Sequence, residues 1–176
     1  MRYDILALKK KEAIFTKEVR DHFVAFFKNH DYTKTNPDVI LYNINTEDDA
    51  NKVYYGTGLY LILTDYLSDS NDCTFVFNDL KAIYRGHCYT IKSRIKSHLF
   101  NPSYKLSDAG KATQYNVCLK LDGNNGINVL EDPYAKQHWQ IVVHKMKNSS
   151  RMIREQAELA FDDVFSRPFG SKEVIK

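Results

Sequence analysis

Two short apolar runs followed by a segment of helical spacing constrain the fold of this chain more than any other feature. Gly58 to Leu63 is an uninterrupted apolar run, and Lys81 to Tyr84 is a second segment rich in apolar residues. Both have the length and composition of buried strands. From Ile91 to Leu99, apolar residues recur every four positions, as on one face of an α-helix. The sequence therefore predicts two strands and then a helix.

Each predicted strand carries a short motif that contains a tyrosine and a glycine. The first is Gly-Leu-Tyr at residues 58–60, and the second is Tyr-Arg-Gly at residues 84–86. In the predicted helix, Arg94 follows the second motif by eight residues, and His98 lies four residues further along the same face. Two phenols, a guanidinium and an imidazole around one concave surface suit the cleavage of a phosphodiester.

This ordered combination resembles the GIY-YIG nuclease family. The core of that family is a small antiparallel sheet that carries the two tyrosine motifs, followed by a helix that bears the arginine. The resemblance covers roughly residues 54–170 and implies an α+β fold in which helices flank a small antiparallel sheet. It divides the chain into an N-terminal helical extension, residues 1–53, and a GIY-YIG-like nuclease domain, residues 54–176.

The resemblance also implies roles for individual residues. Tyr60 is expected beside the attacked phosphate as a general base whose pKa is lowered by nearby cations, with Tyr84 supporting it or the phosphate by hydrogen bonding. Arg94 is expected to bind the non-bridging phosphate oxygens. His98 is expected to join the phosphate or leaving-group network. His87 is a further candidate, because some related restriction enzymes carry a functional histidine at this position.

A single glutamate on the helix after the third strand binds the metal in this family. Two glutamates, Glu158 and Glu155, lie in the helix expected at residues 151–165. We favour Glu158 because Pro168 follows it at about the spacing usual in the family, and Glu155 stays as the alternative. One carboxylate with several waters is typical of Mg²⁺, which Mn²⁺ is expected to replace. The family's asparagine after the proline is not matched, and Ser171 lies in its place.

Charge is unevenly distributed along the chain. Between Lys81 and Lys120 there are eight basic residues and one acid, whereas the segment from Glu47 to Asp79 is acidic. Such a basic segment suits a polyanion, with a plain solvated face as the alternative. Because side chains alternate along a strand, Arg85 is expected to point away from Tyr84 toward solvent. The side chains expected to contact nucleic acid are Arg85, Lys92, Lys96, Lys105 and Lys111.

The rest of the sequence predicts additional helices and strands. Helices are expected at residues 4–13, 16–29, 46–54 and 151–165, and strands at residues 39–44 and 139–146. Residues 122–126 are rich in Gly and Asn and are expected to turn a hairpin between residues 115–121 and 127–130. The first 53 residues are expected to pack on the core or to serve in oligomerisation.

Composition favours a globular protein over a membrane or disulfide-bonded one. Apolar residues make up 43% of the 176 residues, no apolar stretch reaches about 18 residues, and the three cysteines lack paired spacing. We expect a cytoplasmic protein that binds double-stranded DNA and no membrane, with a homodimer left open. The leading function is a metal-dependent endonuclease, of restriction or defence type, that hydrolyses DNA phosphodiester bonds. The alternative is a catalytically silent nucleic-acid-binding module on the same fold.

Overall fold

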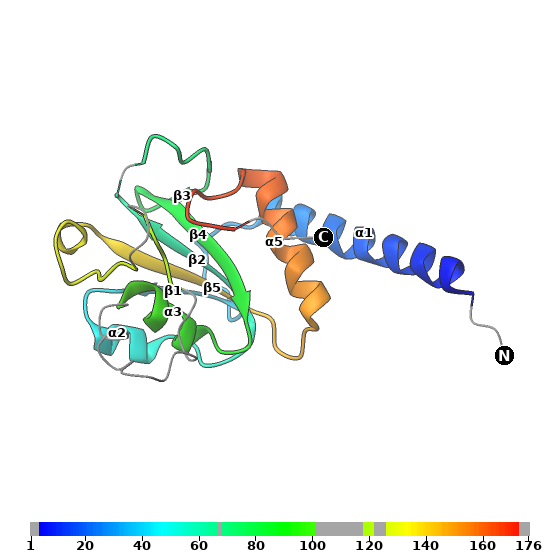
Figure 1. Cartoon of the computed structure of the whole chain (residues 1–176), viewed down its shortest axis with the longest axis horizontal. Coiled ribbons are helices and arrows are strands. Elements are labelled where there is room, and N and C mark those ends of the chain that lie inside the picture. The colour runs from blue at the N-terminus through cyan, green and yellow to red at the C-terminus, as the bar shows by residue number, and fades with distance from the viewer. Residues whose placement is uncertain (1–3, 67, 101–117, 122–125, 173–176) are drawn as a thin grey trace.

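A curled five-stranded antiparallel sheet organises the structure, a computed structural model that describes residues 4–66, 68–100, 118–121 and 126–172 (Figure 1). The strands are β1 (Val39–Asn43), β2 (Gly58–Thr64), β3 (Val76–Phe77), β4 (Leu80–Cys88) and β5 (Trp139–Lys145), and they lie in the order β1-β5-β2-β4-β3. The helices are α1 (Ile5–Asn29), α2 (Glu47–Lys52), α3 (Ile91–Leu99) and α5 (Arg151–Phe165), with a 3-10 turn at η1 (Tyr134–Lys136). The expected α+β class is confirmed.

The central position of β2 accounts for its uninterrupted apolar sequence. β2 pairs with β4 on one side and with β5 on the other, and all seven of its residues are buried. The register places Tyr60 beside Gly86 of β4 and Val143 of β5. A strand with helices over both faces has no side toward solvent, so it shows no polar alternation. The strands expected at residues 58–63 and 81–84 are confirmed, and the second continues to Cys88.

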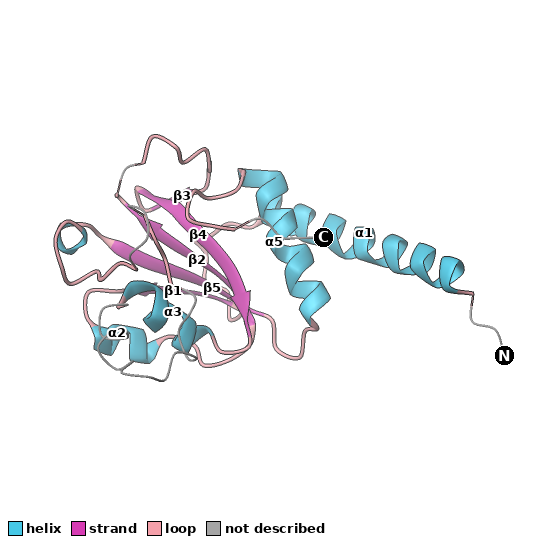
Figure 2. Ribbon diagram, in the orientation of Figure 1, coloured by secondary structure: helices cyan, strands magenta, loops and turns pink. Residues whose placement is uncertain are grey.

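Successive side chains of β2 point into two separate apolar clusters, one on each face of the sheet. On one face Ile62 packs with Ile95, which belongs to the fully buried stripe that the sequence predicted for α3. On the other face Leu61 packs in a cluster with Phe161 of α5 and Phe27 of α1. Figure 2 shows α2 and α3 grouped beside one part of the sheet, and α1 and α5 together at another. The two clusters fix both helix layers relative to the sheet.

α1 is one helix of 25 residues, so the two helices expected in this segment form a single element. The expected break was wrong because the intervening residues include neither Gly nor Pro, and the Thr16 hydroxyl donates to the carbonyl of Glu12 within the helix. Near the end of α1, Phe27 is only 3% exposed, and its ring packs against that of Phe161. The first half of the helix projects beyond the rest of the molecule (Figure 1).

The chain before residue 54 also contributes to the sheet. β1 pairs along its whole length with β5, so residues 1–53 share the sheet with the later part of the chain. α2 begins at a capping box in which Thr46 Oγ1 accepts from the Asp49 amide and the Asp49 carboxylate accepts from the Thr46 amide. In the part of the chain that the structure describes, no helix combines the length and apolar character needed to cross a membrane.

The C-terminal elements follow their sequence expectations. β5 and α5 lie where the sequence predicts them, and Ser150 caps α5 by accepting from the Ile153 amide at 3.3 Å. The hairpin expected around residues 122–126 falls mostly outside the described residues. On its flanks, the Ile127 amide donates to the Leu119 carbonyl at 3.1 Å.

Side chains, rather than a full-length strand, cover the outer edge of β4. β3 pairs with only its first two residues. Further along, the Ser171 hydroxyl accepts from the Arg85 amide at 2.7 Å and donates to the Arg85 carbonyl at 3.2 Å. The Glu158 carboxylate lies beside this edge, 3.5 Å from Nη1 of Arg85. Covering an edge in this way blocks pairing with another chain. Ser171 therefore has a structural role at this edge.

The packing of α1 on α5 can be tested by truncating one phenylalanine. Phe27→Ala removes a buried ring and is expected to lower the free energy of unfolding by about 3–5 kcal/mol. Phe15→Ala is the matched control, since Phe15 is 51% exposed, and it is expected to change stability by less than about 0.5 kcal/mol. Urea unfolding followed by circular dichroism measures both values. Equal effects of the two substitutions would contradict the docking of α1.

Candidate active site

Three of the predicted site residues form one chain of packed rings. The Tyr60 hydroxyl lies 2.8 Å from Nε2 of His98, and the centroids of the Tyr84 and His98 rings are 4.4 Å apart. The two phenol rings stack with their centroids 5.9 Å apart. A Cβ at Gly86 would lie 2.8 Å from the Tyr60 hydroxyl and 2.8 Å from the edge of the Tyr84 ring. The packing of the two tyrosines therefore requires the glycine of the second motif.

The inner two rings of this chain are hidden from solvent. Tyr60 is 1% exposed and His98 is 0% exposed, whereas Tyr84 is only partly buried. Burial raises the pKa of Tyr60 well above its ordinary value, and the opposing effect of Arg94 is smaller. The expectation that cations lower the pKa of Tyr60 is therefore wrong. Burial also lowers the pKa of His98 to about 3, so its ring is neutral at pH 7. Tyr84 is therefore the more exposed of the two phenols.

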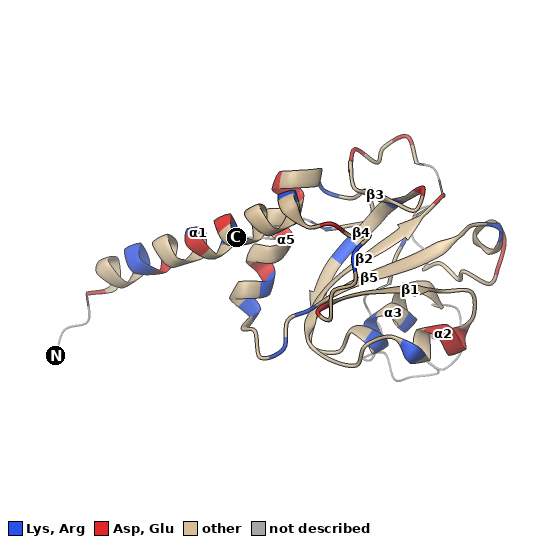
Figure 3. Cartoon of the chain, turned by 180° about the vertical axis from the view of Figure 1, so that it is seen from behind, with Lys and Arg blue, Asp and Glu red and all other residues tan. Residues whose placement is uncertain are grey.

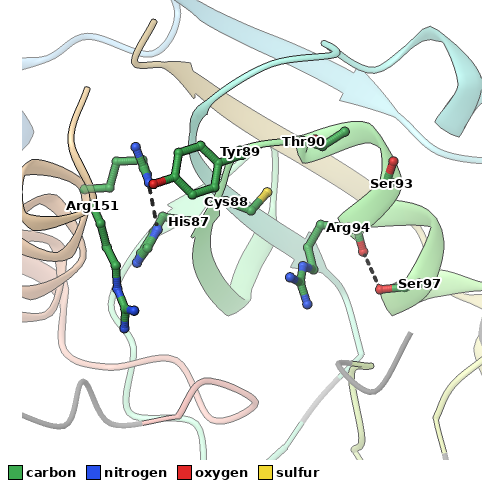
Figure 4. Close-up of a pocket in the computed structure, with 9 residues that line it drawn as sticks. His87, Cys88, Tyr89, Thr90, Ser93, Arg94, Ser97 and Arg151 are labelled. Carbon is green, nitrogen blue, oxygen red and sulfur yellow. Dashed lines mark hydrogen bonds between the residues drawn. The ribbon is translucent and has the colours of Figure 1, made fainter. Parts of the chain in front are cut away.

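A cleft of about 380 Å³ lies where the end of β4 meets the first turns of α3 and α5 (Figure 4). Figure 4 shows Arg94 on the α3 side and Arg151 on the α5 side, with His87 and Cys88 between them. Of the described residues that line the cleft, three are arginines and none is acidic. The lining residues are His87, Cys88, Tyr89, Thr90, Ser93, Arg94, Ser97, Arg151 and Arg154. The cleft is therefore suited to an anion.

The buried stripe of α3 determines which side chains reach the cleft. Because Ile95 and its apolar neighbours one turn away face the sheet, Ser93 and Arg94 turn toward the cleft. The first turn of α3 contains no acidic residue, so the partial positive charge of the helix start is not offset there. Arg94 therefore lies at a position whose surroundings already favour negative charge.

The α5 wall supplies two arginines, Arg151 and Arg154, that the family motifs did not single out. Arg151 does pair with Glu155, at 2.7 Å, and its side chain is 75% exposed. Arg154 is 0% exposed and lines the cleft. Their position in the sequence could have indicated this site. Two arginines in the first turns of a helix, after a Ser150 cap, are unusual because acidic residues are preferred there. Basic residues in this location are expected where an anion binds.

Arg85 does not lie on a solvated surface. Alternation along β4 does turn it away from Tyr84, as expected, but its side chain is 3% exposed and faces α5. Its Nε and Nη2 donate to the two carboxylate oxygens of Asp162 at 3.0 and 2.6 Å. A guanidinium engaged in this bidentate pair is not free for nucleic acid. The expectation that Arg85 contacts nucleic acid is therefore wrong.

Two of the lysines predicted to contact nucleic acid, Lys92 and Lys96, do not line the cleft. Lys92 and Lys96 are partly exposed on α3, and Lys96 pairs with Glu47 of α2 at 3.5 Å. Figure 3 shows ribbon coloured blue for basic residues on α3 and at the start of α5, and red for acidic residues on α2. Lys105 and Lys111 fall outside the described residues. The basic surface beside the cleft therefore includes Lys92, while the charge of Lys96 is partly offset.

Glu158 is the better placed of the two candidate metal ligands, but its surroundings do not fit a divalent cation. Its carboxylate is 3.5 Å from Arg85 Nη1 and 3.8 Å from His87 Nε2. Burial raises the pKa of Glu158 to about 7. A metal ion would therefore compete with a proton, as well as with Arg85, for this carboxylate. No group of three or more His, Cys, Asp or Glu side chains able to hold a metal occurs among the described residues. Glu155 is engaged by Arg151.

Comparisons with known proteins give no match: no protein-family model matches the chain, and neither a curated protein nor a solved structure resembles it significantly. The function must therefore be argued from the geometry of the site and from the resemblance of its motifs.

Buried histidines predict acid-sensitive folding. Burial lowers the pKa of His87 to about 4 and those of His98 and His144 to about 3, whereas in the unfolded chain they titrate near 6.5. The stability that they provide is present above pH 6.5 and is lost as pH falls toward the folded-state values. The raised pKa of Glu158 acts in the opposite direction between pH 7 and 4.5. We expect a net loss of stability from pH 7 to pH 5.

One substitution isolates this effect. His144→Gln is expected to shrink the loss between pH 7 and pH 5 by about 1–2 kcal/mol, because one buried histidine no longer takes up a proton on unfolding. His22→Gln, at an exposed position on α1, is the control. Urea unfolding at both pH values gives the free energies. The linkage is refuted if H144Q and wild-type protein lose equal stability.

Proposed function

We propose that this chain is an endonuclease of the GIY-YIG type that hydrolyses nucleic-acid phosphodiester bonds, with double-stranded DNA as the favoured substrate. The observation that carries the proposal is the cleft between α3 and α5, which is lined by three arginines and no described acid. Around it lie Arg94 and His87, two of the residues singled out by the motifs. Supporting this, the first tyrosine motif lies on the central strand and the arginine on the helix that follows the second motif.

In this proposal Arg94 has the main electrostatic role. A guanidinium at the cleft binds two non-bridging phosphate oxygens and neutralises the charge that develops as water attacks. The start of α3 adds to this stabilisation, because its partial positive charge points toward the same cleft. A dry, preorganised positive site is expected to supply the larger part of the rate acceleration.

Tyr84 is assigned to contact the phosphate or the attacking water, and Tyr60 to hold Tyr84 in place. This assignment exchanges the roles that the resemblance implies for the two tyrosines. It follows from the exposure of the two phenols and from the stacking of their rings. The neutral ring of His98 hydrogen-bonds to Tyr60 and holds this tyrosine in position. Because its pKa is about 3, His98 orients Tyr60 and does not accept a proton.

A divalent metal belongs to the activity that the resemblance implies, but none of the steps assigned here depends on one. Glu158 lies 3.5 Å from Arg85 Nη1 and does not line the cleft, so the described carboxylates supply no ready ligand there. The cleavage assay should therefore compare Mg²⁺, Mn²⁺ and EDTA. Cleavage only with a metal would mean that Glu158 leaves Arg85 when substrate binds.

A second function is favoured by one specific observation. Tyr60 and Glu158, which the resemblance places at the reaction, both have fixed structural partners and almost no exposure. A nuclease fold in which these groups serve only stability would be a catalytically silent nucleic-acid-binding module. Plasmid cleavage and a mobility shift on the same preparation distinguish the two functions. Salt-dependent binding without cleavage under any metal condition would favour the silent module.

Arg94→Gln tests charge neutralisation in the cleft. We expect cleavage to fall by about 10²–10⁴-fold, since one strong electrostatic contributor to the transition state is removed. Lys92→Gln removes the same charge from the same helix outside the cleft, and its effect should stay within about threefold. Gel quantification of nicked and linear plasmid provides the rates. Equal rates for R94Q and K92Q would exclude Arg94 from the reaction.

Removing single hydroxyl groups tests the order of the two tyrosines. Tyr84→Phe is expected to lose most cleavage activity at unchanged stability, because the outer hydroxyl meets the phosphate or water. Tyr60→Phe is expected to lower the free energy of unfolding by about 1–3 kcal/mol, since it leaves the buried Nε2 of His98 without a partner. Its activity should exceed that of Y84F. The opposite ranking of activities would restore Tyr60 as the group beside the phosphate.

A further inference from the structure

Arg154 is a buried cation without a counter-ion. Its side chain is 0% exposed, and no described carboxylate forms an ion pair with it. One of its terminal nitrogens, Nη2, is buried and has no hydrogen-bond partner. Buried arginines are normally paired, because an isolated charge and an unsatisfied N–H group both oppose folding. An arginine in this state at the wall of a cleft indicates that a ligand completes its environment.

Neutral groups hold the guanidinium in place and leave its charge intact. Nε donates to Nδ1 of His87 at 3.3 Å, and Nη1 donates to the carbonyl of Ser149. The ring of Tyr89 lies 4.2 Å from the guanidinium carbon. His87 stays neutral, because burial and Arg154 itself lower its pKa to about 4. The side chain is therefore preorganised, with three fixed contacts and one free donor.

The surroundings of Arg154 select for negative charge. It shares the cleft with Arg94 and Arg151, and the start of α5 adds the positive end of a 15-residue helix. The hydroxyl groups of Thr90 and Ser93 also line the cleft. Phosphate oxygens match such a set of donors and charges better than a carboxylate would, because they offer more acceptors around one centre.

We propose that the α5 end of the cleft is a second phosphate subsite, in which Nη2 of Arg154 donates to a phosphate oxygen and Arg151 adds charge. A strand would then be held at two phosphate groups, one at Arg94 and one at Arg154. This inference rests on the proposed function only where it identifies the bound molecule as a nucleic-acid strand. Its chemistry, the recognition of a phosphate group by a buried guanidinium, stands independently of any cleavage.

The test measures phosphate binding to the full chain by its melting temperature. Inorganic phosphate is titrated at constant ionic strength against chloride, and wild-type protein is expected to be stabilised as phosphate rises. Arg154→Gln should weaken the apparent affinity for phosphate by about tenfold or more. Lys17→Gln removes one charge from an exposed position on α1 and should leave the affinity unchanged within about twofold. Arg154→Lys, which keeps the charge without the planar fork, should be intermediate.

A second arm distinguishes free phosphate from a nucleic-acid strand as the source of the group. Binding of a short duplex and of a single strand is measured in EDTA over a range of salt concentrations. A strand ligand predicts that R154Q reduces the slope of log affinity against log salt by about one, with K17Q unchanged. A site for free phosphate predicts tight phosphate binding with no change in that slope.

The outcomes separate this subsite from the proposed nuclease activity. If phosphate stabilises the wild-type protein and R154Q loses this stabilisation, the subsite is supported even if no nucleic acid is ever cut. Wild-type protein that phosphate does not stabilise, with strand binding that R154Q leaves unchanged, overturns it even if cleavage is observed. Equal phosphate affinity in wild type and R154Q also overturns it. If R154Q does not fold, R154K alone decides: full wild-type affinity and slope would contradict recognition by the guanidinium fork.

Discussion

The partly buried ion pair between Arg85 and Asp162, together with the apolar packing of α5, sets where the cleft forms. It joins the middle of β4 to the last part of α5 through two hydrogen bonds of 3.0 and 2.6 Å. With α5 anchored there, its first turn lies beside His87, at the end of β4. Such a pair adds little net stability, but leaving one partner unpaired would be strongly destabilising. The apolar cluster holds α5 on the sheet, and the pair sets the register of the helix that carries Arg151 and Arg154.

β4 serves both walls of the site because its side chains alternate. Tyr84 and Gly86 face the tyrosine–histidine chain beneath α3, while Arg85 and His87 face α5. Burial keeps the histidines neutral, so they position other groups and carry no charge of their own. The positive charge of the cleft comes from arginines, which stay ionised under all ordinary conditions. An anion site built in this way keeps its charge across the physiological pH range.

Local patterns predicted the elements, but long-range contacts decided the roles of several residues. The apolar run of β2 and the four-residue spacing of α3 are visible in single segments, so both were predictable. Arg85 and Asp162 are 77 residues apart, and nothing near Arg85 in the sequence indicates its partner. The burial of Tyr60 likewise follows from its central strand. Arg154 was missed because its isolation depends on how α5 packs, although two arginines after a helix cap were a usable signal.

The central claim is that the cleft between α3 and α5 binds phosphate groups of a nucleic-acid strand. A crystal structure of the protein with a short duplex, made resistant to cleavage by phosphorothioate linkages, tests it most directly. The account predicts one phosphate within hydrogen-bond distance of Arg94 and a second one against Nη2 of Arg154, with Tyr84 facing the first. A duplex bound elsewhere on the molecule, with both arginines free of phosphate, would contradict it.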